Sequence, residues 1–528
     1  MTLIDGAKRI AAAYVPALLG TLILLAVLAA NGQPTVFPDT QEYYGAANHI
    51  YHDLAHRDRV GETININGDV VTKEYATNPR TLAYKSGRIM SRPIFYGLLM
   101  YPLHKLGTLW LLAAVQAAAA AYVVLVLWRA ALPKAPVGNY LAMMAMLAVG
   151  TPLTFFTGFA MPDVFAFLGV VAAACSLFYW NRLTVLDKLG VWIVLTASIM
   201  FHTSHLVSGL AMLVLGVALL VVEGLPFVGA MKRAVPLAAA LVTAVTCNMA
   251  YNMSWQAERG YKPLRPPFLA ARVLADGTGR DYLRKSCGEG ASWALCAYKN
   301  QPLLDNHHIL FSKDPGFGVA YLADVETLEK IDREELKFVM AAVANQPFRQ
   351  VLVSLKNTAL QLVRFGPGEP LSSPFNMLNN PRASRSILPL LVPNAERCRK
   401  SGCRPRVAVE IWWAIDIVIM GLAAGFLVWR LSADDVLPRR FGVPSELSKA
   451  DRNLVGVALF LAMAVVVNAG VCGALSAPAH RYQARVVALA PMAAWLVASS
   501  LGLRRRRRAG EDMKDTSLAP GLAVEAQA

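Results

Sequence analysis

Uncharged apolar runs long enough to cross a bilayer recur along almost the whole chain. The first extends from Ala11 to Ala30, and similar runs follow up to about residue 503. A helix needs about 20 mainly apolar residues to cross the hydrocarbon core, where only helices and closed barrels satisfy every backbone polar group. Apolar residues make up 55% of the 528-residue chain and charged residues 16%, and the mean hydropathy is +0.42. The sequence therefore predicts an all-α polytopic membrane protein.

We expect about ten transmembrane helices. The predicted spans are about 11–31, 108–129, 138–157, 162–180, two short spans within 189–222, and then 234–252, 408–430, 453–475 and 482–503. The first run lacks a small-residue cleavage site followed by a soluble domain, so it is interpreted as a retained span rather than a signal peptide. The run from Leu189 to Val222 is long for one helix and short for two, and its length alone leaves both readings open.

The distribution of positive charge favours two short spans in that run. The net charge of +16 is concentrated in short clusters at span ends, most visibly Arg504–Arg508. Such clusters are typical of cytoplasmic loops, whereas a basic nucleic-acid-binding face fits this distribution poorly. Two spans place Arg504–Arg508 and both termini in the cytoplasm, and place residues 253–407 outside. A single span would place both outer cysteine pairs in the cytoplasm and Arg504–Arg508 outside, against both the redox and the charge rules.

Four regions follow from this topology. Residues 1–252 form a first transmembrane module, which includes a first outer loop at 32–107 with interfacial helices. Residues 253–407 form a large outer region of helical and irregular structure, residues 408–503 hold the last three spans, and residues 504–528 form a basic, disordered cytoplasmic tail. Within the outer region, Pro347–Phe365 is amphipathic but too charged for a span, which predicts a helix lying on the outer membrane surface.

The seven cysteines divide by location. Three lie in apolar runs and are expected to be packing residues: Cys175, Cys247 and Cys472. The other four form two close pairs in the outer region, Cys287 with Cys296 and Cys398 with Cys403. On an oxidising side of the membrane these pairs predict two local disulfides. A four-cysteine zinc site is the weaker alternative, because the intervals of nine and five residues exceed the usual spacing.

The predicted topology brings four polar stretches to one face of the membrane. They are residues 35–44, which contain Asp39 and Glu42; the turn at 158–163, which ends in Asp163; the turn that contains His202 and His205; and residues 477–485, which contain Arg481 and Arg485. Charged groups inside or next to spans are costly and usually face a cavity or a partner. The alternatives are arginines that extend to lipid headgroups and, for Asp39, a cap on a short helix.

A family resemblance rests on the stretch between the first two spans. Residues 91–107 read SRPIFYGLLMYPLHKLG, and the next span opens with WLLAAVQ at 110–116. Together with an acid in the first outer loop, this pattern resembles the GT-C superfamily of polyprenyl-phosphate-sugar-dependent membrane glycosyltransferases. The resemblance covers mainly residues 10–180, with a weaker match at 476–500. Ile94-Phe95 replaces the usual Pro-Gly, and Asp39-Thr40 replaces the Asp-Glu pair of some branches.

The resemblance implies a glycosyltransferase in a bacterial inner membrane, with its active site facing the periplasm. It would move a sugar from a polyprenyl-phosphate donor to a glycan, lipid or protein acceptor by single displacement, with Asp39 as general base. Guanidinium groups pair well with phosphate. The expected substrate- and phosphate-binding residues are Arg92, Asp163, Arg481, Tyr482, Arg485, Lys262 and Arg265. The expected supporting residues are Glu42, Tyr43, His202 and His205.

Two alternatives stay open at this point. No metal site is predicted with certainty, but a divalent cation could bind His49, His52 and His56 together with Asp39, since the histidine spacings place them on one helix face. The other reading of these histidines is the polar face of an interfacial helix. The alternative function is a transporter or flippase of lipid-linked glycans without transferase activity, and a non-catalytic assembly protein is a weaker third.

Overall fold

The computed structural model describes residues 3–55, 63–64, 70–371, 405–432 and 449–502. Within them the only strands are a short antiparallel pair, β1 (Thr63–Ile64) and β2 (Val70–Val71). The helices up to residue 259 are α1 (Leu3–Asn31), α2 (Thr40–Ala55), α3 (Lys73–Thr77), η2 (Ala83–Lys85), α4 (Phe95–Ala131), α5 (Val137–Gly150), α6 (Leu153–Thr157), α7 (Val164–Tyr179), η3 (Trp180–Arg182), α8 (Val185–Met200), α9 (Thr203–Val222) and α10 (Phe227–Arg259). Those that follow are α11 (Phe268–Asp276), α12 (Thr278–Gly288), η4 (Ala294–Tyr298), α13 (Asn306–Phe311), α14 (Val325–Asn345), α15 (Pro347–Val363), α19 (Val409–Ser432), α20 (Lys449–Leu475) and α21 (His480–Ala484).

Eight helices in the described part of the chain are long and apolar enough to cross a membrane. They are Ala12–Asn31, Phe95–Ala131, Val164–Arg182, Thr203–Val222, Phe227–Arg259, Val409–Arg430, Asn453–Leu475 and His480–Gly502. The prediction of a helical membrane protein is therefore confirmed, whereas the predicted count of about ten spans is not. Two predicted spans account for the difference, because α5 has 14 residues and α8 has 16.

The predicted span at 138–157 is interrupted rather than continuous. Helix α5 ends at Gly150, and α6 begins at Leu153 after Pro152. Proline has no backbone N–H to continue the helical ladder, and Thr151 instead donates its hydroxyl to the Leu147 carbonyl at 2.6 Å. The run at 189–222 does divide into two helices, since α8 ends at Met200 and α9 begins at Thr203.

Helix α4 combines an interfacial helix with a span, as the sequence predicts. The helix is kinked at Gly107 and Thr108, where the backbone leaves helical geometry, and Thr108 has a positive φ of 65°. A positive φ is unfavourable for a threonine and marks a fixed change in direction. Residues 95–106 therefore form a helix at an angle to the span that follows, and Phe95 at its start continues from the first outer loop.

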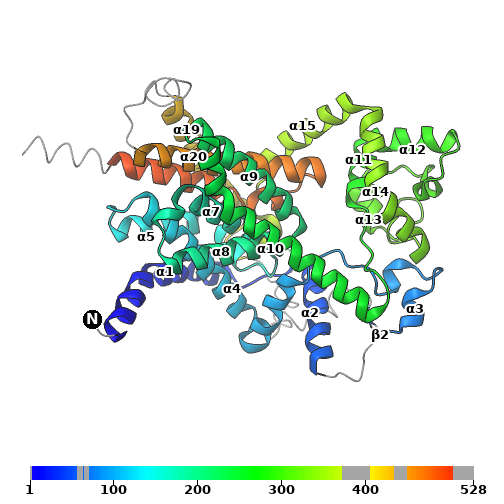
Figure 1. Cartoon of the computed structure of the whole chain (residues 1–528), viewed down its shortest axis with the longest axis horizontal. Helices are drawn as coiled ribbons and strands as arrows, with labels where there is room; N and C mark the ends of the chain where they lie inside the picture. The colour runs from blue at the N-terminus through cyan, green and yellow to red at the C-terminus, as the bar shows by residue number, and fades with distance from the viewer. Residues whose placement is uncertain (1–2, 56–62, 65–69, 372–404, 433–448, 503–528) are drawn as a thin grey trace, which may run out of the picture.

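The apolar helices pack around α7, which is buried along almost its whole length. It contacts α4, α8, α9, α10 and α20, and together these helices form the main hydrophobic core. Figure 1 shows α7 among these neighbours, with α1 and α5 at one side. The N-termini of α2, α4, α7 and α9 all lie at the end of the bundle that carries the candidate site.

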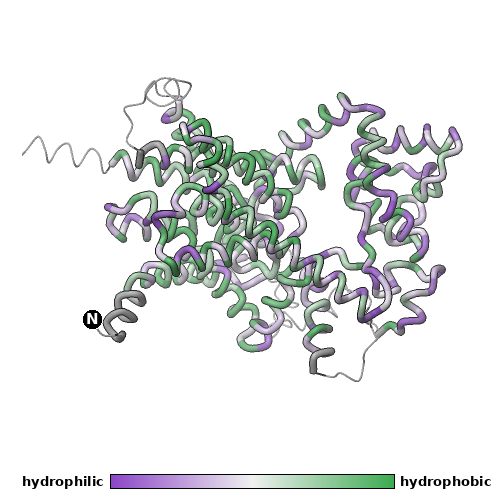
Figure 2. Tube along the Cα trace, viewed as in Figure 1, coloured by the Kyte–Doolittle hydropathy of each residue, from purple (hydrophilic) through white to green (hydrophobic). Residues whose placement is uncertain are grey.

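Helices α11–α14 form a separate small core beside the bundle. Its buried residues include Leu274, Leu283, Ile309 and Phe338. A disulfide joins Cys287 to Cys296, so the first predicted disulfide is present. Cys398 and Cys403 lie outside the described residues. Figure 2 shows hydrophilic residues concentrated over α11–α14 and hydrophobic residues over the long helices.

Helix α15 joins this outer region to the bundle by packing along α20. Its polar residues Gln350 and Asn357 are buried, whereas Phe348, Leu352 and Leu355 are exposed. The helix is thus amphipathic, as predicted, but it turns its polar face toward the protein. In water such an exposed apolar face is unfavourable, whereas at a lipid surface it is stabilised.

Candidate active site

The segment before Asp39 is held against the loop that precedes Asp163. Thr35 donates its N–H to the Gly158 carbonyl at 2.9 Å, and Ala160 donates its N–H back to the Thr35 carbonyl at 2.8 Å. The hydroxyl of Thr40, the first residue of α2, donates to the Ala160 carbonyl at 3.0 Å. These backbone contacts bring the starts of α2 and α7 together, although the two segments are far apart in the sequence.

Gln116 fixes the same loop from inside helix α4. Its amide donates to the carbonyls of Thr157 and Phe159, at 2.9 and 3.1 Å. Its oxygen accepts the Tyr96 hydroxyl at 3.0 Å. The side chain is fully buried, so all of these bonds lie in the protein interior. Gln116 therefore acts as a structural clamp on the loop before Asp163.

Asp39 faces two arginines from different elements. Arg92, just before α4, contacts Asp39 Oδ2 through Nη2 at 2.6 Å. Arg481, on α21, approaches the same oxygen through Nη2 at 3.9 Å. Asp39 Oδ1 makes no hydrogen bond with the described residues. Asp39 does immediately precede α2, but its side chain is engaged by arginines at a shared site.

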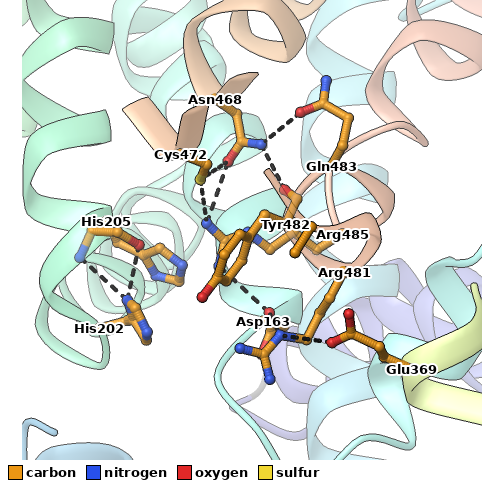
Figure 3. A network of polar contacts seen from close by, with 12 residues as sticks. Asp163, His202, His205, Glu369, Asn468, Cys472, Arg481, Tyr482, Gln483 and Arg485 are labelled. Atoms are coloured by element: carbon orange, nitrogen blue, oxygen red, sulfur yellow. Dashed lines mark hydrogen bonds and ion pairs between the residues drawn. The ribbon is translucent and has the colours of Figure 1, made fainter. Parts of the chain in front are cut away.

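Asp163 occupies the position between Arg481 and Arg485. Its Oδ1 lies 3.6 Å from Arg481 Nε and 3.4 Å from Arg485 Nη1, as Figure 3 shows. The Asp163 side chain is 3% exposed, so these contacts are shielded from water. The ring of Tyr482 lies between the two guanidinium groups, at 5.2 Å and 5.3 Å from their central carbons. Asp39, Arg92, Asp163, Arg481, Tyr482 and Arg485 therefore converge on one site.

Several guanidinium donors in this cluster are buried without a hydrogen bond to the described residues. They are Arg92 Nε, Arg481 Nε and Nη1, and Arg485 Nε. Buried polar groups in proteins almost always have a partner, and an unsatisfied group destabilises the fold. The N-termini of α2, α7 and α9, which carry partial positive charge, lie at the same end of the bundle. Together these donors and dipoles suit an anionic ligand with several acceptor oxygens.

Glu42 and Tyr43 lie in the first turn of α2, which follows Asp39 in the chain. Glu42 accepts a short hydrogen bond from the Ser91 hydroxyl, and its carboxylate lies 3.9 Å from Arg92 Nε. Burial raises the pKa of the Glu42 carboxyl, and the charge on Arg92 opposes that rise. Burial lowers the pKa of Arg92, but Asp39, Tyr43 and Glu42 raise it more, so Arg92 stays charged. The Tyr43 hydroxyl is buried without a hydrogen-bond partner among the described residues.

His202 and His205 lie at the edge of the cluster. His202 precedes α9, and its Nδ1 accepts the Ser204 N–H at 3.2 Å. Burial lowers the pKa of His202, and nearby His205 and the arginines lower it further, which keeps the ring neutral. His205 Nδ1 bonds to the Ser198 carbonyl at 2.8 Å. Because a carbonyl only accepts, Nδ1 carries the proton, and His205 Nε2 is left as a buried acceptor without a partner in the described structure.

His205 also lines a small cavity between α7, α8, α9, α10 and α20. The cavity holds about 30 Å³, and its polar lining residues are Ser198, His205, Ser208 and Asn468. This volume is enough for about two water molecules. It is therefore too small for a sugar or a lipid chain, but it allows a hydroxyl or water to donate to His205 Nε2.

Sequence reasoning missed Asn468 and Glu369. Asn468, on α20, donates to the Tyr482 carbonyl at 2.6 Å, and its oxygen lies 3.4 Å from Arg485 Nη2. An amide in an otherwise apolar span is a signal that could have identified it. Glu369 lies 3.6 Å from Arg481 Nε. It lies at the start of a helical segment that begins at residue 368. In the sequence it is a lone acid among glycines and prolines, which resembles any exposed loop residue, so the sequence offers no signal for it.

Lys262 and Arg265, predicted as a second phosphate clamp, lie elsewhere. Both side chains are exposed, and both act electrostatically on Asp332 of α14. The Lys262 carbonyl accepts from Arg88 at 3.1 Å. These two residues belong to the junction between the first outer loop and the outer region rather than to the arginine cluster.

No group of three or more His, Cys, Asp or Glu in the described part of the chain is arranged to hold a metal ion. The side chains of His49, His52 and His56 lie outside the described residues. A comparison with known protein families, with curated proteins and with solved structures finds no match to this chain. The functional argument therefore rests on the geometry of the site.

Proposed function

We propose that this protein is a membrane glycosyltransferase of the GT-C type, which uses a polyprenyl-phosphate sugar as donor. The observation that carries the proposal is the set of buried, unsatisfied guanidinium donors around Asp39, at one end of a bundle of apolar helices. Guanidinium groups bind phosphate oxygens in pairs, and a lipid-linked donor needs its phosphate held next to the bilayer. The resemblance of residues 91–116 to the GT-C superfamily supports the same assignment.

In the proposed reaction, Asp39 acts as general base. Its Oδ2 is engaged by Arg92, whereas Oδ1 has no hydrogen bond with the described residues and is the atom that accepts the proton of the acceptor hydroxyl. The hydroxyl oxygen then forms a bond to the anomeric carbon while the bond from that carbon to the phosphate oxygen breaks. Single displacement inverts the anomeric configuration. The leaving polyprenyl phosphate is an anion, so it requires charge stabilisation rather than protonation.

The arginines supply that stabilisation. Arg481 and Arg485 lie on either side of Asp163, and this buried carboxylate holds both guanidinium groups in position. A preorganised donor gains most from a site that excludes water, because the charge that develops on the phosphate is then not screened. Asp163 thus has the role of a positioning residue.

We further propose a ten-span topology in a bacterial inner membrane, with both termini in the cytoplasm and the site facing the periplasm. In this topology α8 is a short crossing, and α5 with α6 is an interrupted one. The Cys287–Cys296 disulfide supports an oxidising location for the outer region. The acceptor, a glycan, lipid or protein, would approach from that side. The exposed apolar face of α15 would lie in the outer leaflet.

Asp39→Asn tests the proposed function. We expect transfer to fall about 10²- to 10⁴-fold, because a positioned general base contributes that much. The measurement is release of labelled sugar from a panel of polyprenyl-phosphate hexoses and pentoses, by purified protein in detergent, since slow transfer to water needs no knowledge of the acceptor. Asp314→Asn, an exposed change in the outer region, is the matched control.

Undiminished transfer by Asp39→Asn would show that Asp39 is not the base. If the wild-type protein binds polyprenyl phosphate but transfers no sugar from any donor in membranes, the transporter or flippase alternative is correct instead.

A further inference from the structure

A short segment after α15 lies beside the arginine cluster. We call residues 364–371 the strap. At its start, Gly366 donates its N–H to His480 Nδ1 at 3.0 Å. At its end, the Thr35 hydroxyl donates to the Pro370 carbonyl at 2.6 Å. The strap is thereby fixed at one end to the start of α21 and at the other to the segment that leads to Asp39.

Glu369 is the residue of the strap that points into the cluster, as Figure 3 shows. Its carboxylate lies 3.6 Å from Arg481 Nε. This distance makes an ion pair but exceeds a normal hydrogen bond, and Arg481 Nε and Nη1 remain without a hydrogen bond to the described residues. Glu369 therefore neutralises Arg481 without satisfying its guanidinium donors, while the backbone N–H of Arg481 helps to hold the Glu369 carboxylate.

Glu369 is also the most exposed carboxylate in the cluster. Its side chain is 36% exposed, compared with 22% for Glu42, 17% for Asp39 and 3% for Asp163. Glu42 accepts a hydrogen bond from Ser91, Asp39 is bound by Arg92, and Asp163 contacts two arginines. The carboxylate that can return to water at the lowest cost is therefore Glu369.

The charges of the cluster indicate that Glu369 is displaced from Arg481 when a phosphate binds. The described cluster has four carboxylates, Asp39, Glu42, Asp163 and Glu369, and three guanidinium groups, Arg92, Arg481 and Arg485. When all of these groups are ionised, their net charge is negative, and an incoming phosphate adds further negative charge. Two like charges that share one guanidinium repel each other, so the phosphate favours displacement of Glu369, the most exposed carboxylate of the cluster.

We propose that Glu369 sets the affinity of the site for the donor phosphate. In the donor-free protein its carboxylate occupies Arg481, and the phosphate displaces it and moves the strap outward. This inference rests on the proposed function, because it assumes that Arg481 binds the donor phosphate. It adds a residue of the strap that competes with the donor phosphate for Arg481 and thereby weakens donor binding.

Glu369→Gln tests the proposal, with geranyl monophosphate as the probe and isothermal titration calorimetry of the purified full-length protein as the measurement. The variant keeps the shape of the side chain and removes its charge. We expect the Kd for the probe to fall about two- to fivefold, given the strength of a partly exposed ion pair. Glu326→Gln, which neutralises an exposed acid paired with Lys330 on α14, is the control and should leave the Kd unchanged.

Thr35→Val provides a second test with the Glu369 charge intact. It removes the hydroxyl that bonds to Pro370, so the strap is released more easily and the Kd should again fall. An unchanged or higher Kd in both variants, with binding that still depends on Arg481, would overturn the role of Glu369 and leave the proposed function standing. Binding of the probe that is unaffected by Arg481→Lys would instead remove the phosphate site, and the role of Glu369 with it.

Discussion

Asp276 and Asp163 are both buried carboxylates that face arginines, but their neighbours satisfy them differently. Asp276, at the end of α11, accepts from Arg272 and from Asn357 at 3.0 Å through Oδ1, and from Gln350 at 2.9 Å through Oδ2. Among the described residues, Asp163 has one hydrogen bond, at 3.4 Å, and one longer ion pair at 3.6 Å, both through Oδ1. Both oxygens of Asp276 accept hydrogen bonds, and among the described residues the cluster leaves one buried guanidinium donor unpaired, Arg272 Nε, whereas the two arginines beside Asp163 leave three.

This difference distinguishes a structural cluster from a candidate site. The Asp276 cluster ties α11 to α15, and Arg272 extends it to the Ser476 carbonyl at 2.9 Å, so it joins the outer region to the end of α20. A network in which the buried carboxylate and most of its donors are paired makes one arrangement rigid. The Asp163 cluster leaves several guanidinium donors unpaired among the described residues, which is unfavourable for stability alone. An unfavourable arrangement of this kind is expected where a ligand completes it.

The largest effect on stability should come from Asp276→Ala. Removal of this carboxylate leaves Arg272 buried without its partner, and breaking a buried pair costs about 3–5 kcal/mol. The measurement is thermal unfolding of the purified protein in detergent. Asp281→Ala is the matched control, because its pair with Arg349 is 40% and 48% exposed and should contribute under about 1 kcal/mol. Equal losses in the two variants would contradict a structural role for the Asp276 cluster.

Arg481→Lys should affect binding more than stability. The lysine keeps the positive charge beside Asp163 but loses the planar fork that binds two phosphate oxygens. We expect the Kd for geranyl monophosphate to rise by a factor of about 10 to 150, which corresponds to about 1.5–3 kcal/mol for hydrogen bonds to a charged group. The unfolding temperature should change little. Arg349→Lys, at an exposed position of the outer region, is the control, and a large fall in stability with unchanged binding would place Arg481 in the structural class.

Gly97→Ala should have the smallest of these effects and tests the geometry of the site without any change in charge. A Cβ at Gly97 would lie 2.1 Å from the Tyr43 carbonyl oxygen, so α2 would have to shift away from α4. Overpacking of this kind costs about 1–3 kcal/mol, and the shift should displace Asp39 and lower the rate of transfer. Gly138→Ala on α5, where a Cβ meets nothing within 4 Å, should leave both unfolding temperature and transfer unchanged. Transfer that survives Gly97→Ala would mean that the position of Asp39 is not critical.

Much of the fold could be predicted from the sequence, because the relevant signals are local. Span length and hydropathy identified the membrane class, and the prolines and polar turns marked most helix ends. The kink at Gly107 and Thr108 also lies where the sequence predicts the change from interfacial helix to span. The count of ten spans is not confirmed, because α5 and α8 are shorter than a full crossing and the way a short helix sits in a bilayer depends on its neighbours.

The candidate site, like the fold, could be predicted from the sequence only in part. Residue type and membrane side are enough to single out Asp39, Arg92, Asp163, Arg481 and Arg485, since charged groups near spans are rare. The sequence did not separate them from Lys262 and Arg265, which carry the same charge as the arginines and lie at a comparable distance from a span. Only the tertiary structure places those two residues near Asp332, through backbone hydrogen bonds between Leu264 and both Arg88 and Met90.

By itself, then, the sequence determined that this chain is a helical membrane protein with charged groups at one end of its spans. The tertiary structure decided which of these charges meet. The charged groups are brought together by hydrogen bonds between distant segments. These bonds are made by the backbone of Thr35 and by the side-chain amides of Gln116 and Asn468. Such contacts follow from the three-dimensional approach of helices and leave no periodic pattern in the sequence. For the same reason Glu369, an ordinary loop acid in the sequence, lies against Arg481 in the fold.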